Sequence, residues 1–198
     1  MKVTIAVSLL LFALAGIVMT AVLFKREIKG LYNQYRPLLL DGGGENCLRS
    51  LRKRGVDFKE IGHSGSDICP IRNAVRVSKF RGTTPSGPFI LSCSTALNLT
   101  QWIEDYNINR LSHMGTINCR KMQGRGVLSE HSFGTAIDIA SVNGASVKKD
   151  WGANTANGQL LATVAKGACK YFSNVLTPKT NRLHHDHFHF DNGLGRRC

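Results

Sequence analysis

Two short segments, well separated along the chain, contain side chains that could together bind a metal ion. The first contains His131 and Asp138 in an H-x6-D spacing, and Asp138 interrupts Ala-Ile-Asp-Ile-Ala, which otherwise reads as a buried strand. A buried carboxylate is costly unless a cation or several hydrogen-bond donors compensate its charge. Gly134 predicts a turn between the two residues, so both side chains could converge on one point. An aspartate that caps backbone amides is the alternative interpretation.

The second segment reads His-His-Asp-His-Phe-His-Phe-Asp over residues 184–191. Strand alternation would place two phenylalanines on one face, and three histidines and an aspartate on the other. These are Phe188 and Phe190 against His185, His187, His189 and Asp191. Protonated imidazoles on one face repel each other, and a metal ion is the usual reason to group them in the neutral form. A surface histidine cluster is the alternative, and His184 could reach the same face only if the chain bends before the strand.

The elements that must position these residues predict an α+β domain, a small antiparallel sheet with flanking helices. We expect a short basic helix over 47–54, a helix over 95–106 and another containing Leu161 to Phe172. In the last two, apolar residues recur with helical spacing. Gly55 should end the first helix, and Ser94 or Thr95 should cap the second. Residues 74–80 and 89–93 read as strands, separated by a turn rich in glycine and proline.

The N-terminus predicts a membrane anchor. Thr4 to Phe24 contains no charged side chain, and at about 1.5 Å per residue it could cross a hydrocarbon core of about 30 Å. We expect residues 1–24 to be a transmembrane signal-anchor, 25–46 a juxtamembrane linker and 47–198 the folded domain. The protein would then be a single-pass protein of the inner (cytoplasmic) membrane, with its domain in the periplasm or outside the cell. A signal peptide cleaved near Ala13-Leu14-Ala15 is the alternative.

Cysteine usage favours an oxidising compartment. Six cysteines follow the apolar segment and none forms a C-x-x-C pair, which indicates three disulfides rather than a cysteine zinc site. The pairing that we expect is Cys47–Cys69, Cys93–Cys119 and Cys169–Cys198. The formal charge of +13 favours polyanionic partners. Export and the absence of a nucleic-acid-binding motif argue against nucleic acid.

The motifs resemble those of a known peptidase superfamily. Ser129-x-His131-x-x-Gly134-x-Ala136-x-Asp138 resembles the S-x-H-x-x-G-x-A-x-D motif of D-Ala-D-Ala metallopeptidases. His187-x-His189 resembles the H-x-H strand of their superfamily, the lysostaphin, D-Ala-D-Ala metallopeptidase and hedgehog (LAS) superfamily. With Cys119-Arg120 and Asp150-Trp151, residues 47–198 resemble the bacterial extensin-like C-terminal domain family more closely still.

This resemblance implies a LAS-type zinc peptidase-like domain in which His131, Asp138 and His189 bind one Zn²⁺. Three protein ligands leave a position for water, whose pKa zinc would lower towards about 7. His187 and His184 would be the catalytic residues. The D-Ala-D-Ala carboxypeptidases have glutamate where this chain has His187, whereas penicillin-insensitive murein endopeptidases have similar histidine spacing. Arg120 would bind a substrate carboxylate.

We therefore expect a zinc metallopeptidase that hydrolyses amide bonds in peptidoglycan peptides, as a crosslink endopeptidase. The alternative is a non-catalytic, zinc-containing module that binds the cell wall or envelope. His187 favours the enzyme, because a purely structural zinc site would be expected to have four protein ligands. The sequence does not indicate the bond that is cleaved or the oligomeric state.

Overall fold

A computed structural model describes residues 44–124 and 126–198, together with Thr20 and Phe24. The chain divides between Leu38 and Leu39 into two units, and the second unit contains the predicted folded domain. The predicted membrane anchor and most of the predicted linker lie outside the described residues. Within the described part of the chain, no helix combines the length and the apolar character needed to span a bilayer.

The described elements confirm a mixed α+β architecture with small, mainly antiparallel sheets. The α-helices are α2 (Gly44–Lys53), α3 (Cys93–Asp105), α4 (Val147–Asp150) and α5 (Ala156–Ala168), and the 3-10 helices are η1 (Glu130–Phe133) and η2 (Arg182–His184). The strands are β1 (Asp57–Ser66), β2 (Cys69–Lys79), β3 (Thr84–Pro85), β4 (Phe89–Ser92), β5 (Arg110–Gly115), β6 (Ala136–Val142), β7 (Ala145–Ser146), β8 (Asn174–Leu176) and β9 (Phe188–Asp191).

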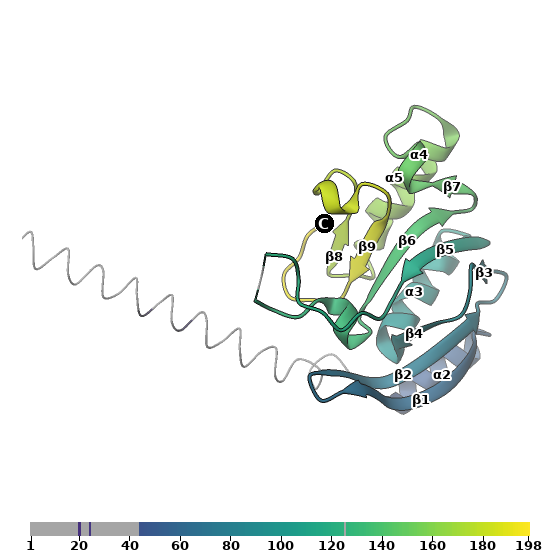
Figure 1. Cartoon of the computed structure of the whole chain (residues 1–198). Coiled ribbons are helices and arrows are strands. Elements are labelled where there is room, and N and C mark those ends of the chain that lie inside the picture. The colour runs from purple at the N-terminus through teal and green to yellow at the C-terminus, as the bar shows by residue number, and fades with distance from the viewer. Residues whose placement is uncertain (1–19, 21–23, 25–43, 125) are drawn as a thin grey trace, which may run out of the picture. The chain divides into compact units, whose positions relative to one another are not determined.

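Two sheets organise the second unit (Figure 1). One has the order β1-β2-β4 and the other β3-β5-β6-β9-β8, with β7 paired to β6. Every strand pair is antiparallel except β3 with β5. Strand β6 therefore lies between β5 and β9, and side chains from segments distant in sequence meet on its exposed face.

The opposite face of the larger sheet packs against α3 and α5. Trp102 of α3 is fully buried, makes an edge-to-face contact with Phe190 of β9, and donates a hydrogen bond from Nε1 to the carbonyl of Val164 in α5. Leu99 and Ile103 complete the buried stripe that helical spacing predicted. The phenylalanines of β9 thus belong to the core, which directs His189 to the other face.

Helix ends differ in detail from the sequence expectation. The N-cap of α3 is Ser92, whose hydroxyl accepts a hydrogen bond from the Thr95 amide, so the predicted cap at Ser94 or Thr95 was wrong. Thr95 is itself buried and lies within the first turn. Helix α2 begins earlier than predicted, at Gly44, and Gly55 follows its end with φ of 70°. Glycine adopts this left-handed conformation without steric cost.

The disulfides correct two of the three predicted pairs. Cys169–Cys198 is present as expected, but the other bridges are Cys47–Cys93 and Cys69–Cys119. The pairing follows packing rather than order in the chain. Helix α2 lies against the beginning of α3, which joins the first pair, and the start of β2 lies against the loop after β5, which joins the second. The second bridge fixes the loop that leads into the candidate metal centre.

Candidate metal centre

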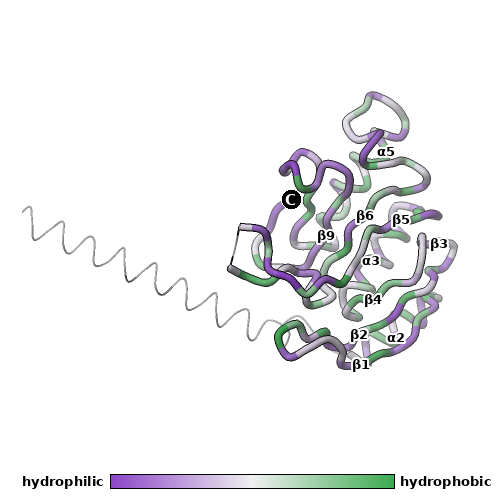
Figure 2. Tube along the Cα trace, in the orientation of Figure 1, coloured by the Kyte–Doolittle hydropathy of each residue, from purple (hydrophilic) through white to green (hydrophobic). Residues whose placement is uncertain are grey.

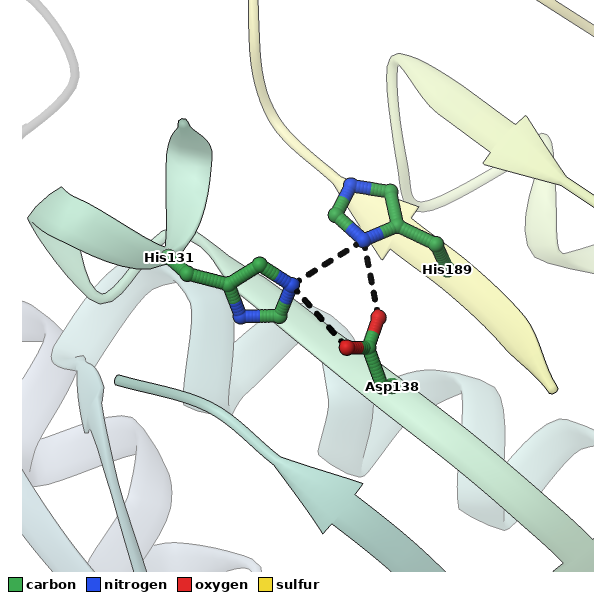
Figure 3. Close-up of side chains that lie close together, drawn as sticks. All are labelled: His131, Asp138 and His189. Atoms are coloured by element: carbon green, nitrogen blue, oxygen red, sulfur yellow. Dashed lines mark hydrogen bonds and ion pairs between the residues drawn. The ribbon is translucent and has the colours of Figure 1, made fainter. Parts of the chain in front are cut away.

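Strands β6 and β9 place Asp138 and His189 at directly opposite positions. The antiparallel register pairs Asp138 with His189 and Ile139 with Phe188. Ile139 and Phe188 are fully buried, so the alternating residues Asp138 and His189 project from the other face of the sheet. The strand pairing therefore fixes these two side chains next to each other, as Figure 3 shows.

The third side chain of the centre, His131, comes from the short helix η1. This helix ends at Gly134, which has φ of 64°. A Cβ atom at this position would lie 2.9 Å from Cγ2 of Ile71 and 3.1 Å from the amide nitrogen of Ser92. Only glycine fits both the backbone conformation and the close contact with β2 and β4. Gly134 thus lets the chain turn from η1 into β6 and brings His131 over Asp138.

Three potential ligand atoms converge at short range (Figure 3). Nε2 of His131 lies 3.1 Å from Nδ1 of His189 and 3.2 Å from Oδ2 of Asp138. Nδ1 of His189 lies 2.9 Å from Oδ1 of Asp138. Bonds of 2.0–2.1 Å to a tetrahedral zinc ion would separate its ligand atoms by about 3.3 Å. The spacing of the three atoms is therefore close to that required for direct coordination of one ion.

Hydrogen bonds on the far side of both imidazoles fix which nitrogen faces the centre. Nδ1 of His131 lies 3.1 Å from the carbonyl of Thr116, so it must donate. Nε2 of His189 lies 2.9 Å from the carboxylate of Asp191, so it must also donate. When the rings are neutral, their inward nitrogens present lone pairs to each other and to Asp138. Three converging acceptors require either a metal ion or added protons between them, which fits a metal site.

The same geometry perturbs the titration of the groups. Burial alone would raise the pKa of Asp138, but hydrogen bonds with His131 and His189 hold it well below its usual range. Burial alone would lower the pKa of His189, but hydrogen bonds to Asp138 and Asp191 outweigh it and raise the pKa to about 9. Without a metal ion, a proton on His189 therefore supplies the positive charge that the acceptors require.

This competition between proton and metal predicts a pH dependence. The raised pKa of His189 stabilises the metal-free fold fully below the unfolded pKa of about 6.5, and that contribution is lost as pH rises through about 9. We expect the Tm of the metal-free protein to fall over this interval. The increase in Tm produced by one equivalent of Zn²⁺ should grow over the same interval, because the metal no longer displaces a proton.

Differential scanning calorimetry of the metal-free and zinc-loaded full chain at pH 6, 7.5 and 9 measures this change. In His189→Ala the growth of the zinc effect with pH should disappear. A zinc effect on Tm that stays constant or shrinks towards pH 9 would contradict the assignment of the proton to His189.

His187 lies beside the centre and is oriented by a carboxylate. Its Nδ1 lies 2.8 Å from Oδ1 of Asp186, and its Nε2 lies 3.6 Å from Oδ1 of Asp138. Donation from Nδ1 leaves the Nε2 lone pair directed towards the centre. The hydrogen bond with His187 holds the pKa of Asp186 below its usual range, so this carboxylate remains an acceptor. His187 thus presents an acceptor nitrogen next to the converging ligand atoms.

The chain bends before β9, so His184 and His185, which precede the strand, differ in position. The ring of His184, at the end of η2, lies 5.3 Å from that of His187 and 5.7 Å from that of His189, measured between centroids. Burial, together with the charges of His189 and His187, lowers the pKa of His184 to about 4. His185 precedes the strand and is 63% exposed, so the prediction that it shares the imidazole face was wrong.

Arg120, the predicted substrate-binding residue, lies in the loop after β5. Its backbone is tied to the segment that contains His131, because its carbonyl accepts hydrogen bonds from the Ser129 amide and the Ser132 hydroxyl. The side chain is exposed, and its guanidinium contacts no carboxylate among the described residues. The cation is therefore available to a ligand from solvent.

Some contributors to the centre had no signal in the sequence. The carbonyl of Thr116 orients His131, and a backbone acceptor does not depend on residue type. Asn174 donates to Asp191, whose pKa burial alone would raise but which hydrogen bonds from His189 and Asn174 hold below its usual range. Asn181 accepts from Nδ1 of His184. Both asparagines come from loops or short strands whose pairing partners the sequence did not reveal.

The comparisons with known proteins identify the family. Residues 45–198 match the family described as extensin-like protein C-terminus. No curated protein and no solved structure matches the chain. The match covers the described helices and strands from α2 onwards apart from the first residue of α2, and it includes every side chain of the candidate metal centre. The chain belongs to the extensin-like protein C-terminus family.

Proposed function

We propose that this protein is a zinc metallopeptidase of the LAS superfamily that cleaves peptide crosslinks of peptidoglycan. The observation that supports this most directly is the convergence of three ligand atoms, His131 Nε2, His189 Nδ1 and an Asp138 oxygen, beside the oriented ring of His187. Two neutral imidazoles and one carboxylate suit Zn²⁺ and leave a coordination position open. When bound, the zinc would acidify a water molecule and polarise the carbonyl of the substrate.

The side chains around the centre can perform the proton transfers of amide hydrolysis. Nε2 of His187 accepts the proton of the attacking water and returns it to the leaving nitrogen, and Asp186 holds the ring in the tautomer required. His184 stays neutral at pH 7 because its pKa lies near 4. Its Nδ1 is fixed by Asn181, so its Nε2 offers an acceptor to the substrate rather than a charge.

Features beside the centre suit a peptide with carboxylates and small apolar side chains. The exposed guanidinium of Arg120 can bind a carboxylate in bidentate fashion. Two exposed large apolar side chains directly adjoin, in sequence, residues that orient or lie beside the centre, Ile117 after Thr116 and Leu183 before His184. Peptidoglycan stem peptides combine both chemical characters.

The disulfides support the proposed location. All six cysteines of the chain are paired, and three disulfides in one small unit are typical of an oxidising compartment. We propose that residues 1–24 anchor the protein in the inner membrane and that the extensin-like domain faces the periplasm or the outside of the cell, where peptidoglycan lies.

The test is release of peptides from purified, crosslinked peptidoglycan by the full chain in non-ionic detergent, with zinc content measured on the same sample. We expect close to one zinc ion per chain and conversion of crosslinked dimers to monomers, analysed by chromatography and mass spectrometry. One zinc per chain without any new peptide would reject the enzyme and favour a zinc-containing wall-binding module. A chain that binds no zinc would reject both.

A further inference from the structure

Strands β1 and β2 carry basic side chains in an unfavourable arrangement. The antiparallel register places Lys59 of β1 directly opposite Arg76 of β2. Both are exposed, and like charges at opposed positions destabilise a strand pair. Among the described residues, Arg52, Arg54 and Lys170 form ion pairs with carboxylates, whereas neither Lys59 nor Arg76 has such a partner. Within the part of the chain that the structure describes, no carboxylate therefore compensates this pair of charges.

Arg72, which lies on β2 together with Arg76, adds a partly buried cation. Its Nε is inaccessible to solvent and has no hydrogen-bond partner in the described structure. A guanidinium cannot lose its proton at any physiological pH, so it cannot avoid this situation by becoming neutral. A buried donor of a charged group without an acceptor is costly. Nε cannot be reached from solvent, so an anion bound from outside can compensate the charge of this guanidinium only through its Nη nitrogens.

The position of these residues links them to the metal centre. Arg72 follows Ile71, which lies against Gly134 at the end of η1, and Cys69 at the start of β2 is bridged to Cys119. Arg76 lies four residues further along β2, beyond Asn73, which has φ of 46° at an irregularity of the β1–β2 register. Figure 1 shows the tip of the β1–β2 hairpin on the same side of the unit as the loop after β5. Arg72 thus adjoins, through Ile71, the segment that contains His131, and Arg76 and Lys59 lie further along the two strands.

These three basic residues differ in charge from the side chains near β9. Figure 2 shows that the segment leading into β9 is largely hydrophilic, and that segment is rich in histidine. Histidine binds metal in the neutral form, so the imidazoles that hold a metal ion offer no positive charge of their own. Permanent cations are instead provided by Arg72, Arg76 and Lys59, and guanidinium groups bind carboxylates through two parallel hydrogen bonds. Their positions on two paired strands fit a ligand that carries several carboxylates.

We propose that Lys59, Arg72 and Arg76 form a carboxylate-binding surface for peptidoglycan stem peptides, extending the metal centre along β2. This inference rests on the proposed function, because it identifies the part of the substrate beyond the bond to be cleaved. The polymer compensates the charge of the Arg72 guanidinium through its Nη nitrogens and neutralises the opposed pair. The surface therefore contributes to retention of the polymeric substrate rather than to the chemical step.

The experiment measures binding of the full chain, in non-ionic detergent on ice, to purified insoluble peptidoglycan by co-sedimentation. The test variant carries Lys59→Gln, Arg72→Gln and Arg76→Gln. The control carries Lys148→Gln, Lys149→Gln and Lys166→Gln, which removes the same charge from exposed positions on α4 and α5. Peptidoglycan whose carboxylates have been amidated, and micelles doped with phosphatidylglycerol, complete the set of ligands.

We expect Kd for peptidoglycan to rise about tenfold in the test variant, through the loss of three partly screened charge contacts, and to change little in the control. Amidated peptidoglycan should bind the wild type as weakly as untreated peptidoglycan binds the test variant. The double variant Lys59→Gln/Arg76→Gln should have an equal or higher Tm than the wild type, because it relieves like-charge repulsion. Weaker binding by that double variant cannot then be attributed to unfolding.

Equal losses in the test and control variants would show a general charge effect and overturn the proposal. A loss confined to the anionic micelles, with peptidoglycan binding unchanged, would also overturn it and assign the surface to lipid headgroups. Cleavage of a short, soluble crosslinked peptide by the wild type depends on the metal centre and not on this surface. Failure of the proposed function would therefore appear in that assay, and failure of this inference only in binding.

Discussion

Replacement of His189 by alanine is expected to remove the zinc ion and with it all hydrolysis. His189 supplies one of three converging ligand atoms, and its other nitrogen is hydrogen-bonded to Asp191. Loss of a direct ligand should lower zinc affinity by more than the roughly 10–100-fold associated with an outer hydrogen-bond partner. Zinc content by mass spectrometry of metals, and peptide release from crosslinked peptidoglycan, measure the two effects.

Two further variants make this test specific. His185→Ala removes an exposed imidazole from the same segment and should leave both zinc content and activity close to wild type. Asp191→Asn keeps the ligand but weakens the acceptor that fixes its tautomer, so zinc affinity should fall by about 10–100-fold. Normal zinc content in His189→Ala, or an equal loss in His185→Ala, would contradict the proposed ligand set.

The directions of Asp138 and His189 could be predicted from the sequence because regular strands determine them, whereas His131 was assigned from the family resemblance. Asp138 interrupts a buried strand, and strand alternation directs His189 away from Phe188 and Phe190. Both are consequences of a period of two residues, which does not depend on the rest of the fold. The turn at Gly134 could also be predicted locally, because glycine readily adopts a positive φ, whereas its contact with Ile71 could not.

Interactions between elements were less accessible. Cys47 pairs with Cys93 because α2 packs on α3, and that contact is a tertiary property which the spacing of cysteines does not encode. The position of His184 depends on η2, a single turn of 3-10 helix that a strict strand pattern does not include. In both cases the sequence supplied the chemical type of the residue, and packing selected its partner.

His187→Ala is expected to lose hydrolysis but to keep its zinc ion, which would separate the catalytic role of His187 from metal binding. Zinc content should stay close to one per chain, because the Nε2 atom of His187 lies 3.6 Å from Asp138 and is not among the three converging ligand atoms. Hydrolysis should fall by about 10²–10⁴-fold, the usual contribution of a positioned acid or base.

Asp186 separates the proton-transfer role of His187 from a structural role. Asp186→Asn leaves the ring in place but removes the charge that favours donation from Nδ1 and stabilises the imidazolium formed when Nε2 accepts a proton. We expect the activity of Asp186→Asn to lie between those of the wild type and His187→Ala, with zinc content unchanged. If His187 had only a structural role, Asp186→Asn would instead retain wild-type activity. Full activity of His187→Ala with normal zinc content would show that the ring is not the base and would transfer the role to His184.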